Sequence, residues 1–419
     1  MRTPGQPNLW YNFSYLGAIQ VSNFILSLIV IPYVVSVLGA EGFGVIAVAQ
    51  ISLFYLSVLV DYGFNRSAIR EVALFSKDTS RLSAIFSYVI FSRLLLSVVA
   101  FLILVLLVES IPLFYSHRTV YYYGFSFVLG QALLMNWFFQ GMEKMKYNAL
   151  SSFFSRLLFT LLVFIFIKQR DDTSLYLFFM GLGNMAAGLL SMATCYYTYK
   201  LEWVQPSIKN FGHELKESWH YTVSNLSMTT IQYGGLFILR LFTNDLVVGY
   251  YSIAEKIYFA MKMMLDVFSQ AAYPRVCVLL QGGMDKTKQF FREGYFYFLC
   301  LVVGGTGVIF IFAPLLIQFF VKHPDSNTSY LLRVLCIALV IVCLHIPAAL
   351  LLLAGDYKKQ YMQVFTLGLL FCLFSNFIGA VYFKATGTVV ATLLTEIFIT
   401  AGLYWQVRSY YKNLPTTVS

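Results

Sequence analysis

The chain alternates between long apolar stretches and short polar breaks. A helix needs about 20 mainly apolar residues to cross the hydrocarbon core of a membrane. About twelve stretches meet that requirement, near 10–37, 43–63, 83–108, 120–140, 149–167, 175–199, 221–241, 249–271, 293–321, 331–354, 361–383 and 388–407. The strands of a membrane barrel alternate apolar and polar residues over about ten positions, and the sequence lacks that alternation. The pattern therefore predicts an all-α polytopic membrane protein.

The longest polar break runs from about 200 to 220 and leaves six stretches on either side. We therefore expect an N-terminal six-helix bundle over 1–200 and a C-terminal six-helix bundle over 221–407. Residues 201–220 are expected to form a cytoplasmic connecting loop, and residues 408–419 a short cytoplasmic tail. No polar break is long enough to fold as an extramembrane domain.

A weak internal repeat supports this division into halves. A shift of 205 positions aligns Asp61 with Asp266 and Arg70 with Arg275. Charged residues are rare in the chain, so two matched charges in one register arise by chance less easily than apolar matches do. Each half has six stretches and begins on the same side of the membrane, so the predicted repeat is parallel.

Composition excludes a soluble domain. Charged residues account for 11% of the chain, against about a quarter in soluble proteins, and the mean hydropathy is +0.72. The net charge of +10 could indicate nucleic-acid binding, but 18 of the 29 Lys and Arg residues fall in one set of breaks and 5 in the opposite set. The positive-inside rule then places both termini in the cytoplasm, and we expect no nucleic-acid partner.

Two arginines lie deep within apolar stretches of the first half. Arg93 is ten residues into the stretch 83–108, and Arg156 is seven residues into the stretch 149–167. Ionisable residues at such depth are costly and usually face a bundle interior or a watery cavity. We expect Arg93 and Arg156 to line a cationic cavity together with Lys256 and Lys262 of the second half.

The stretch 249–271 carries charges at helical spacing. Glu255, Lys262 and Asp266 are separated by 7 and 4 positions, which places them on one helical face. Lys262 and Asp266 can pair across one helical turn, whereas Glu255 has no evident partner four residues away. This face is either a structural ion-pair network or the wall of a polar cavity. Glu396, in the last stretch, is a further buried acid that can pair with a cation or carry a proton.

Enzyme chemistry has no visible basis in the sequence. The six cysteines lie in or beside apolar stretches without a CxxC pair, and the five histidines are scattered. A metal-ligand cluster, a phosphate-cradling glycine loop and a carboxylate–histidine set are all missing from the pattern. We therefore expect no catalytic residues, no metal site and no cofactor beyond a coupling ion such as H⁺ or Na⁺.

Recognisable segments lie in the first seventy residues and after the mid-chain break. They are NFSYLGAIQ (Asn12–Gln20), IPYVVSVLGAEGFG ending at Gly44, DYGFNRSAIREVA starting at Asp61, VVGYYSIAEKI (Val247–Ile257) and AAYPRV (Ala271–Val276). In this combination and order they resemble the polysaccharide-exporter family, specifically the O-antigen flippases called Wzx. The segments cover about a quarter of the chain. Many members carry a basic residue where this chain has Ser36.

The resemblance implies two six-helix bundles around a central cavity, working by alternating access in the bacterial inner membrane. It also implies a substrate of undecaprenyl-diphosphate carrying an oligosaccharide repeat unit of O-antigen or a similar surface polysaccharide. A polysaccharide polymerase and chain-length machinery are expected partners. Asp61 with Arg70, and Asp266 with Arg275, are expected either to form matching gates or to be ordinary helix-end charges.

Two other functions are also weighed against the sequence. A cation-coupled multidrug antiporter of the same broad fold would favour a cavity of acids and aromatics, whereas the deep charges here are mostly basic. A membrane glycosyltransferase or an O-antigen polymerase would be expected to show a large extramembrane loop, which this chain lacks.

Overall fold

The computed structural model describes residues 9–205, 211–281, 283–321 and 326–413. Every regular element within these residues is a helix, so the all-α prediction is confirmed. The chain divides into two compact units, Met1–Thr229 and Thr230–Ser419. Helix α9 begins at Phe211, inside the break expected to form a loop over 201–220. Residues 206–210 of that break, and 414–419 of the expected tail, lie outside the described residues.

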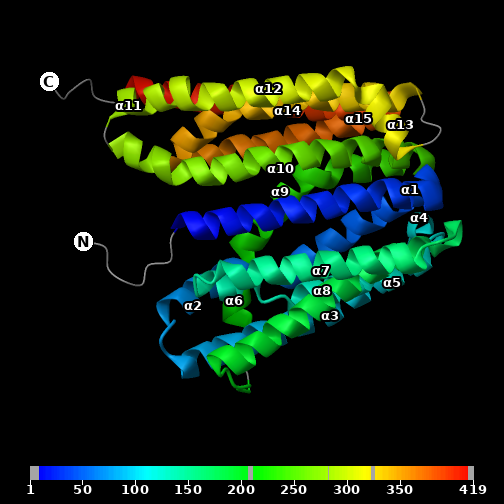
Figure 1. The fold of residues 1–419 in the computed structure, drawn as a ribbon, viewed down its shortest axis with the longest axis vertical. Helices are drawn as coiled ribbons and strands as arrows, with labels where there is room; N and C mark the ends of the chain where they lie inside the picture. The colour runs from blue at the N-terminus through cyan, green and yellow to red at the C-terminus, as the bar shows by residue number, and fades with distance from the viewer. Residues whose placement is uncertain (1–8, 206–210, 282, 322–325, 414–419) are drawn as a thin grey trace. The chain divides into compact units, whose positions relative to one another are not determined.

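The first unit is built around long helices joined by short ones (Figure 1). Its elements are α1 (Leu9–Asp61), α2 (Phe64–Leu74), α3 (Thr79–Ser110), α4 (Pro112–Tyr115), α5 (Arg118–Leu133), α6 (Asn136–Gly141), α7 (Met145–Phe166), the 3₁₀ turn Arg170–Asp172, α8 (Thr173–Tyr199) and the first part of α9 (Phe211–Phe242). Two predicted stretches, 10–37 and 43–63, both fall in α1. They are separated by a kink at Gly39, where φ is 77°, a conformation that glycine adopts without steric cost.

Close packing within the first unit depends on small residues between α5 and α8. A Cβ added to Gly181 of α8 would collide with the backbone of Ser126 and Phe127 in α5. The hydroxyl of Ser126 also donates to the carbonyl of Phe178, at 3.3 Å. Small residues let helix backbones approach closely where no hydrophobic effect drives them together, as in a membrane.

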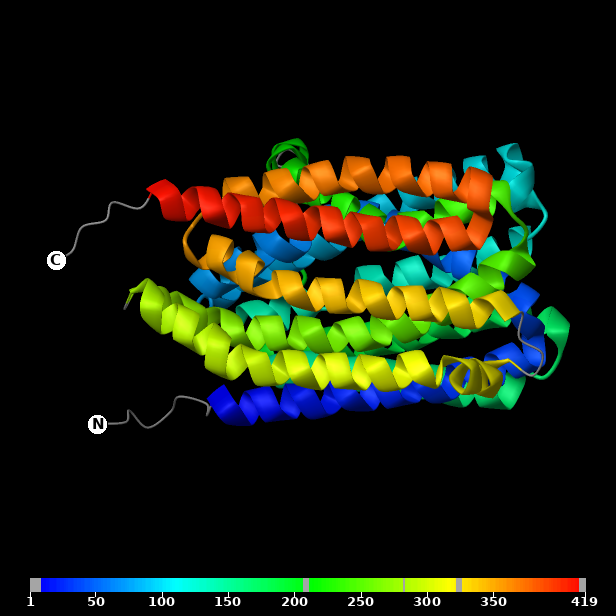
Figure 2. The same cartoon turned by 90° about the horizontal axis from the view of Figure 1, so that it is seen from above.

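In the second unit, α10, α12, α14 and α15 run side by side, as both Figure 1 and Figure 2 show. Its elements after α9 are α10 (Asp245–Gln281), α11 (Met284–Gln289), the π-helical turn Phe290–Tyr295, α12 (Phe296–Ile311), α13 (Ala313–Phe320), α14 (Ser326–Ala354) and α15 (Lys358–Asn413). Helix α15 holds both of the last two predicted stretches. A backbone break at Lys384, with φ 52° and ψ −134°, separates them.

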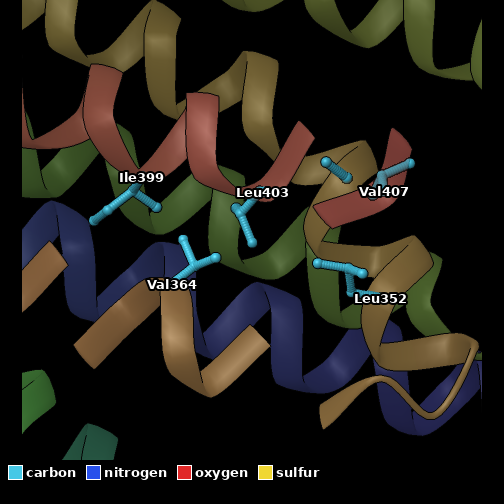
Figure 3. Close-up of a cluster of buried hydrophobic side chains, with 6 residues drawn as sticks. Leu352, Val364, Ile399, Leu403 and Val407 are labelled. Carbon is cyan, nitrogen blue, oxygen red and sulfur yellow. The ribbon is translucent and has the colours of Figure 1, made fainter. Parts of the chain in front are cut away.

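An apolar cluster joins α14 to both halves of α15 (Figure 3). Ile399, Leu403 and Val407 follow one another at four-residue intervals on the second half of α15 and meet Val364 of the first half and Leu352 of α14. Residues four apart lie on the same face of a helix. The cluster therefore fixes which face of this last helical segment points inward.

Seven helical segments of the described part are long and apolar enough to cross a membrane. Two of them, Ile29–Asp61 and Lys358–Ser409, contain the backbone breaks at Gly39 and Lys384. Helix α10 is not among the seven, and it carries four charges between Glu255 and Asp266. The protein is thus a multi-pass membrane protein.

Candidate functional site

Arg93 of α3 is almost fully buried in the first unit, with 3% of its side chain exposed. Its Nη2 donates to Oδ1 of Asp61 at 2.5 Å and to Oδ1 of Asn65 at 2.9 Å. Its Nη1 donates to the carbonyl oxygen of Leu134 at 3.2 Å. One guanidinium therefore ties α3 to the end of α1, to the start of α2 and to the break between α5 and α6.

These contacts change how Arg93, Asp61 and Arg70 are interpreted. Sequence reasoning paired Asp61 with Arg70, but the structure pairs Asp61 with Arg93. The side chain of Arg70 is exposed on α2. Spacing along one segment suggested the first pairing, whereas the second depends on α3 folding back against α1. Arg93 is neutralised by a carboxylate, so in this conformation its charge is not available to a ligand.

Arg156 has a different environment. It lies on α7, partly buried, with its guanidinium carbon 5.9 Å from the ring centroid of Phe159. Tyr176 of α8 is close enough to interact with it electrostatically. In the part of the chain that the structure describes, no carboxylate lies within ion-pair distance of Arg156. It is therefore a partly buried cation that can accept an anionic ligand.

The second unit encloses a polar cavity of about 30 Å³. A cavity of this size holds one or two water molecules, or a small ion. Its polar lining comes from α9, α10 and both halves of α15, and consists of Gln232, Tyr251, Glu255, Tyr258, Lys262, Asn376, Thr392 and Glu396. The α10 face predicted from the sequence thus does line a cavity, through Glu255 and Lys262.

Lys262 pairs with Glu396 rather than with Asp266. Its Nζ lies 3.4 Å from Oε1 of Glu396, and the hydroxyl of Tyr258 donates to the same oxygen at 3.4 Å. Asp266 lies one turn further along α10 and is exposed; it interacts electrostatically with Lys262, but the ion pair of Lys262 in this conformation is with Glu396. The expectation that Glu396 can pair with a cation is met by Lys262.

Glu255 is buried but has a partner within its own helix. The hydroxyl of Tyr251, four residues earlier, donates a hydrogen bond to its carboxylate. Thr392, whose own hydroxyl donates to the carbonyl oxygen of Thr388 at 3.0 Å, lies beside Tyr251. The sequence interpretation that Glu255 lacks a partner four residues away overlooked tyrosine as a donor. Lys256, the next residue, is partly buried and contributes to the electrostatic surroundings of Glu255.

Arg275, at the far end of α10, is exposed, and its guanidinium lies 5.5 Å from the ring centroid of Phe290. The structure therefore does not bring together the second expected gate, Asp266 with Arg275. In this conformation, neither of the two gates inferred from the repeat is closed by the pair that the sequence suggested.

His345 is the site residue that sequence reasoning missed. Its Nδ1 lies 3.9 Å from Oε2 of Glu396 and 3.3 Å from the hydroxyl of Thr400. His345 belongs to α14, so no spacing along one segment could place it beside a carboxylate 51 positions away. Only the packing of α14 against α15 brings the two together.

A family model described as "Polysaccharide biosynthesis protein" matches residues 9–279. The chain belongs to this family. The match spans α1 to α10 and includes Asp61, Arg93, Arg156 and Lys262. It confirms the resemblance that the sequence segments indicated.

Two relatives of this polysaccharide biosynthesis family member match nearly its full length. A protein of Escherichia coli (strain K12) named "Putative O-antigen transporter" is 27% identical over 402 residues, covering 95% of this chain and 96% of the relative. A protein of Shigella dysenteriae with the same name is 25% identical over 392 residues, covering 93% and 97%.

Solved structures show that this family member has a transporter fold. The lipid II flippase MurJ, in an inward closed conformation, superposes with a TM-score of 0.74 over 94% of this chain and 87% of that one. An inward-facing multidrug resistance transporter of the MATE family superposes with a TM-score of 0.70 over 94% and 100%. Both are 14% identical to this chain, so they establish the fold and not the cargo.

Proposed function

We propose that this chain is a flippase for undecaprenyl-diphosphate-linked oligosaccharide. Its cargo is an O-antigen repeat unit or a similar surface polysaccharide unit, moved from the cytoplasmic to the periplasmic face of the inner membrane by alternating access. Family membership, two relatives named as O-antigen transporters and a fold shared with a lipid II flippase support the proposal. The delivered unit would then be available to a polysaccharide polymerase.

The environment of Arg156 is the observation that carries the proposal. Moving a diphosphate with attached sugars through the apolar core of a membrane has a prohibitive free-energy cost. A cation held within the protein offsets that cost. Arg156 is partly buried and has no carboxylate partner among the described residues. Its guanidinium also has the planar, forked geometry that suits phosphate. The prenyl tail can remain in lipid while the headgroup passes through the protein.

The cavity in the second unit supports a separate, coupling role for its acids. At about 30 Å³ it is far too small for a sugar, but it fits a proton, a water molecule or a small cation. Glu255 and Glu396 both line it and are 5% and 6% exposed. Buried carboxylates of this kind mark ion and proton pathways in transporters. We assign coupling to H⁺ or Na⁺ to the acids of this cavity, and we assign Arg156 as one headgroup-binding residue.

A gene deletion tests the proposal. Cells that lack the protein should accumulate lipid-linked oligosaccharide on the cytoplasmic face, and chemical identification of the trapped lipid names the cargo. The wild-type gene should clear the pool, whereas Arg156→Ala should not. If the deletion strain accumulates no lipid-linked sugar while it still makes the precursor, the proposed function is wrong.

A cation-coupled multidrug antiporter is the second candidate, because acids and tyrosines line the enclosed cavity and the fold matches a multidrug transporter. This function predicts that deletion increases sensitivity to cationic drugs and leaves lipid-linked sugars unchanged. The same deletion strain therefore separates the two candidates.

A further inference from the structure

Glu396 faces two nitrogen bases from two different helices. Its Oε1 lies 3.4 Å from Nζ of Lys262 on α10, and its Oε2 lies 3.9 Å from Nδ1 of His345 on α14. Both side chains are largely buried, that of Glu396 8% exposed and that of His345 12% exposed. A single buried carboxylate is thus placed between a lysine and a histidine, with one oxygen toward each.

The hydrogen bonds around His345 define its neutral form. The hydroxyl of Thr400 donates its one hydrogen to the carbonyl oxygen of Glu396, at 2.7 Å. The same hydroxyl can therefore only accept from Nδ1 of His345, 3.3 Å away. Neutral His345 accordingly carries its hydrogen on Nδ1, and Nε2 is the nitrogen that is open to a further proton.

Protonation of His345 would place two cations on one carboxylate. A buried imidazolium is costly unless an anion balances it, and Glu396 is the carboxylate within 4 Å. Glu396 carries one negative charge, so it can neutralise either Lys262 or protonated His345, but not both. Pairing of Glu396 with one of these cations therefore weakens its pairing with the other.

We propose that His345 is a proton-binding residue that competes with Lys262 for Glu396, so that proton binding releases Lys262 to an anionic group of the cargo. Lys262 is the member that can be reached, because 25% of its side chain is exposed against 8% for Glu396. The inference rests on the proposed function, since it takes the cargo's diphosphate as the anion.

Other titratable groups around the cluster do not replace this competition. The charged and titratable side chains that interact electrostatically with Lys262, Glu396 or His345 are Tyr233 of α9, Tyr258 and Asp266 of α10, and Tyr361 and Cys372 of α15. Asp266 is the one other carboxylate in this group, and it is exposed. It can receive Lys262 in the absence of cargo, which makes release of Lys262 from Glu396 less costly.

Proton binding at His345 and anion binding at Lys262 are thermodynamically linked in this proposal, and the link can be measured. If protonation of His345 strengthens binding of an anion, then binding of the anion strengthens protonation by the same factor. Full-length protein in nanodiscs is titrated with a short-chain prenyl diphosphate as the pH is lowered from about 8 to about 4, a range extended below that of an ordinary histidine because burial disfavours a charged imidazole. Affinity of the wild type should rise about fivefold or more, a typical coupling between sites.

Three variants isolate the residue responsible. His345→Gln should lose the extra pH dependence, and Lys262→Met should lose it together with part of the affinity. His117→Gln, in the first unit, should behave as the wild type. Affinities of the wild type and the variants are compared at the same pH. The effect of titration of the diphosphate itself then cancels, because the same ligand is used with every protein.

Equal pH dependence in the wild type and in His345→Gln overturns the proposal. If His345→Gln does not accumulate, proton uptake on ligand binding is measured instead. Addition of prenyl diphosphate to the wild type should cause uptake of more protons than its addition to Lys262→Met. Equal uptake by the two proteins overturns the proposal. Failure of the proposed function gives a distinct result, because prenyl diphosphate would then bind none of these proteins at any pH.

Discussion

Nη2 of Arg93 lies 2.5 Å from Oδ1 of Asp61 and thereby joins the middle of α3 to the end of α1. Arg93 also reaches Asn65 and the carbonyl of Leu134. An arginine that looked like a headgroup ligand in the sequence is thus a structural tie in the first unit. Its removal should affect folding before it affects transport.

Breaking this pair should therefore destabilise the protein. Removal of one partner of a buried ion pair leaves an uncompensated charge and typically costs about 3–5 kcal/mol. Arg93→Met alone and Asp61→Leu alone should both lower the amount of protein in the membrane and its melting temperature in detergent. The double variant should recover most of both. Arg70→Ala, at an exposed position of α2, is the control and should change neither. A wild-type melting temperature for Arg93→Met would contradict the structural role.

Arg156 should show the opposite behaviour. Since no carboxylate balances it among the described residues, Arg156→Ala should leave membrane level and melting temperature near those of the wild type while export is lost. Arg156→Lys should restore export in part, because lysine keeps the charge but lacks the forked geometry. Arg333→Ala is the matched control, since Arg333 is also partly buried and its Nε donates to the carbonyl of Phe310. Full export by Arg156→Ala would remove this residue from the binding site.

Because Lys262 pairs with Glu396, these two residues are tested singly and together in a double variant. Lys262→Met or Glu396→Leu alone should lower protein level, because each leaves a buried charge. Together they should restore the level but not export, because both line the cavity. Lys262→Met with Asp266→Leu should fail to restore the level, since Asp266 is exposed. Export at the wild-type rate by the Lys262→Met, Glu396→Leu protein would show that the pair is only structural.

Hydropathy located the helices well because membrane insertion depends on local composition. The stretches at 10–37 and 43–63 were found from the sequence, but their fusion into one kinked helix at Gly39 was not, since it depends on a single backbone conformation. The same holds for the break at Lys384.

Side-chain partners were less predictable, because they are set by packing between helices. Helical spacing correctly placed Glu255 and Lys262 on one inward face, but it gave Lys262 the wrong partner. Asp266 is four residues away in sequence, whereas Glu396 comes from α15. His345 stood alone in its own stretch, and only the contact between α14 and α15 places it next to a carboxylate.

The predicted orientation can be tested at the two ends of α3. This helix has 32 residues and is about 48 Å long at 1.5 Å per residue, enough to span the membrane. Ser76 and Ser116 flank it and are exposed. In a variant with all six cysteines replaced, an impermeant thiol reagent added to intact cells should label Ser116→Cys but not Ser76→Cys. The reverse pattern would mean that the termini face the periplasm.

Translocation by purified protein tests the central claim most directly. The wild type and Arg156→Ala are reconstituted in liposomes that contain undecaprenyl-diphosphate oligosaccharide in both leaflets, and an impermeant glycosidase is added outside. With the wild type, the inner-leaflet glycan should become accessible and the whole pool should be cleaved. With Arg156→Ala or empty liposomes, cleavage should stop once the outer-leaflet share is consumed. If the wild-type protein leaves the inner-leaflet glycan protected, as empty liposomes do, the flippase assignment is contradicted.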